Sequence, residues 1–136
     1  MFTTYDEIWE TFLNNCKRDD IDLPQTEEKI YSTIRNAVMF FNNRTRENVE
    51  CIDESETLNQ KLSNDYLLIL ANYIRLVFLK NELTYFEGVW QPFQQDVGFK
   101  NFTAQLNSMR ASVKEQNATI DELFRNAEVD YLWHYT

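Results

Sequence analysis

The chain has 136 residues, of which 43% are hydrophobic and 15% aromatic, and its net charge is −9. That is the size of one ordinary domain, and the apolar content argues against disorder over most of the chain. The negative charge argues against sequence-independent nucleic-acid binding, which needs clusters of Lys and Arg, and against anionic membrane surfaces. The two glycines and two prolines favour a few long helices over a β-sandwich with its many turns.

The first helix is predicted from Thr4, which fits a capping box with Glu7. A second helix is expected after Pro24, which suits a first helical turn. The next stretch, residues 42–56, is polar and mixed in charge, so we expect a loop with a short extended piece at residues 49–52. Residues 57–62 are expected to add a helical turn before the next element. The apolar positions that define the two helices are Ile8, Trp9, Phe12, Leu13 and Cys16, followed by Ile30, Ile34, Ala37, Val38 and Phe41.

The central element is predicted at about residues 63–87. Ser63 or Asn64 caps its first turn, and from residue 66 to 79 only Asn72 and Arg75 interrupt the apolar side chains. A helix that is apolar nearly all round lies in a core or in a membrane. The run is short for a membrane span and carries Asn72 and Arg75 in its middle, so we expect a buried helix with others around it. We expect the Arg75 guanidinium to form a structural ion pair with Glu27, Glu28 or a C-terminal acid.

A long last helix, about residues 99–127, has the clearest periodicity. Its apolar seam repeats in steps of four and three and has one polar member, Gln116. Two interpretations stay open: the seam packs on the central helix of the same chain, or part of it faces another subunit and Gln116 sets the register. Small residues seven apart (Ala104, Ala111 and Ala118) form an adjoining stripe, beside the seam residues Phe102, Leu106, Met109, Val113, Gln116, Ile120, Leu123 and Ala127.

The sequence therefore predicts an all-α fold, a small bundle of four to five helices, with residues 1–127 as a single domain and residues 128–136 as an aromatic tail. A terminus is normally polar and frayed, so this tail either folds back on the bundle or anchors in a partner. Its candidate partner-binding residues are Tyr131, Leu132, Trp133 and Tyr135, and Arg44 and Arg46 form a small basic spot.

No catalytic, cofactor-binding or metal site is predicted. The chain has one histidine, His134, in the tail, and Gly88 and Gly98 are isolated, so neither a nucleophile–base pair nor a phosphate loop is indicated. Cys16 and Cys51 are expected as buried or half-buried reduced thiols of a cytoplasmic protein, since the N-terminus has no signal-peptide pattern. Two acidic groups are read as solvated loops rather than cation sites: Asp19, Asp20 and Asp22, and Asp53, Glu54 and Glu56.

The order of elements resembles the head-to-tail adaptor (connector) proteins of tailed bacteriophages. The resemblance runs from about Glu27 to Leu132. It includes a second helix that ends near Arg44 and a loop through Asp53. It continues through residues 58–65 (LNQKLSND), 70–74 (LANYI), 79–83 (LKNEL) and 96–100 (DVGFK), which lead into the last helix.

This resemblance implies a non-enzymatic virion protein of the neck, assembled in the host cytoplasm. Copies of it, commonly twelve, form a ring under the portal protein, extend the DNA channel and meet a neck or tail-completion protein. DNA is then only passing cargo, which an acidic wall does not retain. No cofactor and no membrane are implied. The aromatic tail departs from the family pattern.

Two other classes compete with the adaptor hypothesis. One is an acidic helical regulatory protein that binds and inhibits a host or phage protein. The other, ranked below both, is an enzyme with a carboxylate metal site.

Overall fold

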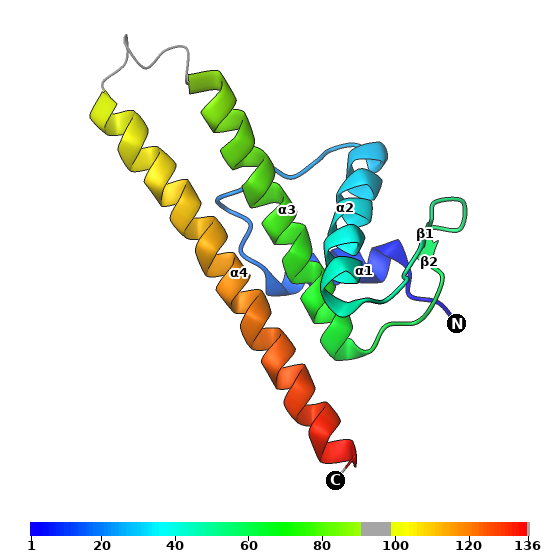
Figure 1. Cartoon of the computed structure of the whole chain (residues 1–136). Coiled ribbons are helices and arrows are strands. Elements are labelled where there is room, and N and C mark those ends of the chain that lie inside the picture. Colours follow the sequence, from blue (N-terminus) through cyan, green and yellow to red (C-terminus); the bar gives the residue numbers. More distant parts are fainter. Residues whose placement is uncertain (91–98, 136) are drawn as a thin grey trace.

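The structure, a computed structural model, describes residues 1–90 and 99–135, with side chains described for residues 1–88 and 103–127. These residues form helices α1 (Tyr5–Asn15), α2 (Glu27–Thr45), α3 (Asn64–Trp90) and α4 (Phe99–Tyr135), with strands β1 (Cys51–Ile52) and β2 (Thr57–Leu58) between α2 and α3. Helices α3 and α4 lie side by side and antiparallel, while α1 and α2 pack on the first part of α3 (Figure 1). The predicted all-α bundle is confirmed, with one small hairpin added.

Helix α3 is the centre of the fold, as predicted. Its first turn is capped by the Ser63 hydroxyl, which accepts a hydrogen bond from the backbone N–H of Tyr66 at 3.2 Å. Between Ile69 and Leu79 every side chain is buried except the half-buried Arg75. Such a helix is stable in water only because α1, α2 and α4 cover it on different sides. It continues to Trp90, slightly beyond the predicted end, and residues 91–98, which include Pro92 and Gly98, lie outside the described residues.

The two N-terminal helices begin at capping side chains. The Thr4 hydroxyl accepts from the backbone N–H of Glu7 at 3.1 Å, which confirms the predicted start of α1. Helix α2 begins later than predicted: Thr26 is its N-cap and accepts from the N–H of Lys29 at 3.4 Å. Pro24 therefore lies in the connector, and its assignment to a first helical turn is wrong. A side chain that can accept from the free N–H groups is the better helix start.

The segment between α2 and α3 is more ordered than the sequence suggests. Helix α2 includes residues 42–45, and the predicted extended piece forms β1, which pairs antiparallel with β2. The helical turn expected at residues 57–62 is wrong, because Thr57 and Leu58 form β2. That strand is also fixed by the N-terminal residues: Leu58 N–H donates to the Thr3 carbonyl at 2.8 Å, and Thr3 N–H donates to the Gln60 carbonyl at 3.1 Å.

The hairpin is clasped to α1 and α2 by its own carboxylates. Asp53 accepts a hydrogen bond from the Tyr5 hydroxyl at 2.6 Å and an ion pair from Arg35, and Glu56 accepts from the Tyr31 hydroxyl. The bond to Glu56 raises the pKa of Tyr31 to about 12. Two of the three acids that the sequence leaves as a solvated group are therefore fastened to the helices, so their role in the fold is structural.

Helix α4 packs on α3 through its predicted seam, so the seam is intramolecular over the described residues. Gln116 and Ile120 are buried, and so is Phe124, which the seam did not include. The side chain of Phe102 lies outside the described residues. Helix α4 runs to Tyr135, beyond the expected end at residue 127, and its last turns extend past the start of α3 (Figure 1). The alanine stripe is exposed at Ala104, Ala111 and Ala118, so it makes no close helix contact within the chain.

Candidate functional site

A chain of polar side chains crosses the core where the α1–α2 connector, α3 and α4 meet. The Arg75 guanidinium donates from Nη1 and Nη2 to the two Asp20 carboxylate oxygens at 2.8 and 2.9 Å, and from Nη1 to the Lys17 carbonyl at 3.1 Å. Its Nε donates to Gln116 Oε1 at 3.2 Å. Gln116 Nε2 in turn donates to the backbone carbonyl of Asn72 at 2.9 Å and to its side-chain oxygen at 3.0 Å.

The burial of this network explains its geometry. Gln116 and Asn72 are only 6% and 7% exposed, so each polar atom must find a protein partner or lose the energy of its hydration. The Asn72 amide donates to the Leu68 carbonyl at 2.9 Å, and no buried side-chain N or O atom of the described residues lacks a partner. The network therefore fixes one register of α4 on α3, because a shift by one residue would leave these groups unpaired.

The predicted partners of Arg75 are wrong. Glu27 and Glu28 lie in the first turn of α2, while Arg75 faces the α1–α2 connector and pairs with Asp20 there. The Asp20 side chain is 31% exposed and that of Arg75 12%. The guanidinium holds the pKa of Asp20 below its usual value, and Asp20 raises the pKa of Arg75. Asp20, which the sequence assigned to a solvated loop, therefore forms a partly buried ion pair at the edge of the core.

Two small cavities of about 220 Å³ each flank the Arg75–Asp20 pair. Cys16 lines the first, and its Sγ lies 3.7 Å from the Ala71 carbonyl. Burial raises the pKa of Cys16 to about 11, so the thiol is protonated at neutral pH and is a poor nucleophile. Glu82 lines the second, and burial raises its pKa while Oε1 accepts the backbone N–H of Asp22 at 3.0 Å. Both thiols are free and half-buried, as predicted.

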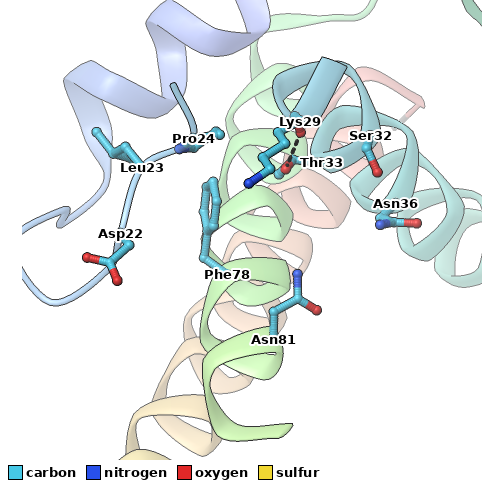
Figure 2. Close-up of a pocket in the computed structure, with 9 residues that line it drawn as sticks. All are labelled: Asp22, Leu23, Pro24, Lys29, Ser32, Thr33, Asn36, Phe78 and Asn81. Atoms are coloured by element: carbon cyan, nitrogen blue, oxygen red, sulfur yellow. Dashed lines mark hydrogen bonds between the residues drawn. The ribbon is translucent and has the colours of Figure 1, made fainter. Parts of the chain in front are cut away.

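A larger cavity of about 340 Å³ lies between the connector, α2 and α3 (Figure 2). Phe78 forms its wall on α3, Lys29 reaches toward it from α2, and Asn36 and Asn81 lie along its opposite edge. The Thr33 hydroxyl that lines the cavity donates to the Lys29 carbonyl at 2.8 Å. The lining combines the Asp22 carboxylate and the Lys29 ammonium with amides, hydroxyls and apolar side chains, and it holds no histidine or cysteine.

The part of the chain that the structure describes holds no cluster of metal-ligating side chains and no helix that could span a membrane. In these residues no three His, Cys, Asp or Glu side chains lie together so as to hold a metal ion. The helices there are also too short or too polar to cross a bilayer.

The predicted partner-binding residues fall into two groups. Arg44 lies near the end of α2 and donates to Asp121 of α4 at 2.8 Å, with its guanidinium carbon 4.6 Å from the centre of the Phe124 ring. It therefore helps to join α2 to α4. Arg46 is exposed and forms the C-cap of α2 in the left-handed conformation, with φ of 62°. Their role in binding a partner stays a prediction.

The aromatic residues of the C-terminus belong to α4 by their backbone. The side chains of Tyr131, Leu132, Trp133 and Tyr135 lie outside the described residues, so their predicted docking role stays a prediction too. Sequence reasoning missed the Asp20 pairing, and it did not identify the exposed pair Met39 and Phe40 on α2.

Comparison with known proteins places this helical protein among phage proteins. The chain belongs to the YomZ prophage protein family, which matches residues 1–129. It is 56% identical over 130 residues to the SPbeta prophage-derived uncharacterized protein YomZ of Bacillus subtilis (strain 168), a match that covers 96% of this chain and 99% of that protein. No solved structure matches the chain. The phage origin that the adaptor resemblance implies is confirmed, while the comparisons identify no adaptor family.

Proposed function

We propose that this protein is a head-to-tail adaptor of a tailed phage, which forms a ring beneath the portal protein and extends the DNA channel toward the neck. The observation that carries the proposal is the prophage origin of the family. A prophage that produces particles must encode the proteins that join its capsid to its tail, and the element order of this chain resembles such proteins.

The arrangement of the long helices supports this role. Helix α4 is covered by α3 along one side, and most of its described side chains on the other sides are exposed. A helix held in this way has a long outer surface for neighbouring subunits. Its exposed alanines would allow a neighbouring helix to approach closely. The C-terminal turns of α4 extend past the start of α3 (Figure 1), and in this role they would bind a partner such as the portal.

The charge of the chain agrees with a channel wall. A net charge of −9 repels the phosphates of passing DNA, so a ring of such subunits would guide DNA without binding it. In this role the protein carries out no bond chemistry and needs no cofactor. Its partners are further copies of itself, the portal protein, and a neck or tail-completion protein.

Particles from an induced lysogen that carries the gene provide the test. We expect mass spectrometry of purified particles to detect the chain, and electron cryomicroscopy to place a ring of it under the portal. Deletion of the gene should yield DNA-filled heads and separate tails. If the chain is absent from particles, and particles without the gene are normal, the adaptor proposal is wrong, and a regulatory protein that binds another protein becomes the better hypothesis.

A further inference from the structure

A small patch of α2 and α3 presents apolar side chains beside a positive charge, and we call it the Phe40 patch (Met39, Phe40 and Lys80). Met39 is 68% exposed and Phe40 39%. The Phe40 ring is stacked on Tyr73, with 6.3 Å between ring centres and 12° between planes, and Lys80 Nζ lies 4.8 Å from its centre. Since the ring is held by both neighbours, it is already ordered before any partner arrives.

The charge of the patch is opposite to that of the chain as a whole. No carboxylate of the described residues forms an ion pair with Lys80, and Asp121 of α4, whose charge acts on Tyr73, is paired with Arg44. On a chain of net charge −9, the half-buried Lys80 places a positive charge beside an exposed apolar surface. It therefore favours a partner surface that combines an apolar side chain with carboxylates.

The N-terminal end of the same chain has this composition. Phe2 is 51% exposed and precedes Thr3, whose backbone is hydrogen-bonded to the hairpin, so the ring projects from a fixed point. Asp6, Glu7 and Glu10 follow on α1 and are exposed. We call this surface the acidic end (Phe2, Asp6, Glu7 and Glu10).

The two surfaces lie on different sides of the molecule. The N-terminus emerges beside the hairpin, on the side of α2 away from α4 (Figure 1). The Phe40 patch lies toward α4, since Tyr73 contacts both Phe40 and Phe124 of α4, whose ring centre is 6.4 Å from that of Tyr73. Two complementary surfaces on different sides of one chain pair head to tail between copies, and repetition of that contact closes a ring or extends a filament.

We infer that the Phe40 patch of one copy receives the acidic end of a second copy, with Phe2 on the apolar surface and the carboxylates of α1 near Lys80. This contact deepens the proposed function, on which it rests, because it supplies the subunit interface of the ring.

Zero-length cross-linking tests the contact directly. A carbodiimide joins Lys80 to a carboxylate only where the two are in contact, and a mixture of ¹⁴N- and ¹⁵N-labelled chains separates links between copies from links within one. We expect mixed-isotope links from Lys80 to Asp6, Glu7 or Glu10, in the concentrated chain or in purified particles. If both samples give no such link, or Lys80 is joined between copies only to other acids, the inference is wrong.

Charge exchange supplies the second test. We expect Lys80→Glu alone, and Asp6→Lys with Glu10→Lys alone, each to weaken self-association about tenfold or more, and a mixture of the two proteins to recover it. Met39→Glu should weaken it as well without loss of folding, because that side chain is mostly exposed. Lys29→Glu, the same charge change at an exposed position of α2 outside both surfaces, is the matched control and should leave association unchanged.

The outcomes separate this contact from the proposed function. If the chain is present in particles as a ring but the Lys80 links are absent, the inference fails and the adaptor role stands. If the chain is absent from particles but its free form gives the links, and the exchanged charges rescue each other, the contact stands and the adaptor role fails.

Discussion

Helices α3 and α4 run side by side, yet they differ sharply in how much of their surface the rest of the chain buries. Helix α3 has 27 residues, and from Ile69 to Leu79 it is buried on nearly every side. Helix α4 has 37 residues, but between residues 103 and 127 only Gln116, Ile120 and Phe124 are buried. The difference shows that α3 is the scaffold of the chain, whereas α4 is held on one side by α3 and keeps its other sides for solvent or partners.

The largest effect is expected when the same negative charge is placed on each helix in turn, because only α3 is buried on nearly every side. Leu70→Asp should abolish folding, because Leu70 is 0% exposed and a buried charge without a partner costs several kcal/mol, comparable to the whole stability of a small domain. The matched change on α4, Ala118→Asp at an exposed position, should alter the free energy of unfolding by no more than about 0.5 kcal/mol. Circular dichroism during thermal unfolding measures both. A Leu70→Asp protein that melts cooperatively would contradict the scaffold role of α3.

The polar contact between the two helices should give the next largest effect. Gln116→Leu removes the partner of the Asn72 oxygens and of Arg75 Nε, and we expect it to lower the free energy of unfolding by about 1–3 kcal/mol. Adding Asn72→Leu should cost less than it does in the wild type, since one unpaired side chain is removed with the other. Denaturant titration of the two single variants and the double variant gives the coupling. If the two changes in free energy of unfolding simply add in the double variant, Gln116 and Asn72 are not energetically coupled.

The Arg75–Asp20 pair should have a smaller effect that depends on pH. Because Arg75 lowers the pKa of Asp20 in the folded state, the pair stabilises the fold above the unfolded-state pKa of about 3.9, and this contribution is lost as pH falls through the lower folded-state value. Asp20→Asn should therefore cost about 1 kcal/mol at pH 7, limited by partial exposure, and less below pH 4. Denaturant titration at both pH values tests this, with Asp19→Asn as the control. If the difference in free energy of unfolding between the wild type and Asp20→Asn is as large below pH 4 as at pH 7, the ion-pair assignment is wrong.

The smallest effect on stability is expected at the far end of α4. Removal of residues 131–136 should change the free energy of unfolding by no more than about 0.5 kcal/mol, because the described core contacts of α4 end at Ala127. The same truncation should weaken assembly with the portal if the aromatic residues dock there. Thermal unfolding and particle yield measure the two effects. Loss of folding would show that these turns belong to the core.

The elements that could be predicted from the sequence are those whose signal is local. The apolar run of residues 66–79 predicts α3, the seam around Gln116 predicts the face of α4 that meets it, and Thr4 predicts the start of α1. In each case the pattern within one segment determines which side chains are buried or which N–H group is capped. Helix periodicity depends only on residues close together in the sequence, so it can be recognised without knowledge of the rest of the fold.

The elements that could not be predicted depend on pairing between distant residues. Strand β2 exists because Thr57 and Leu58 pair with β1 and with the N-terminal residues, and nothing within residues 57–62 distinguishes it from a helical turn. The partner of Arg75 likewise follows from the path of the α1–α2 connector, which brings Asp20 to α3 over 55 residues of separation. The exposure of Phe40 also needs the packed structure, because an aromatic residue on an apolar stripe is normally assigned to the core.

The backbone hydrogen bonds that join Thr3 to Leu58 and Gln60 have a consequence for folding during synthesis on the ribosome. Helix α1 emerges before α3, but its backbone anchor and the helix that buries its apolar face lie more than fifty residues downstream. The nascent N-terminal third therefore leaves the exit tunnel with Ile8 and Phe12 still uncovered. Helix α1 can pack only after α3 has been translated, so the fold forms around α3 rather than from the N-terminus.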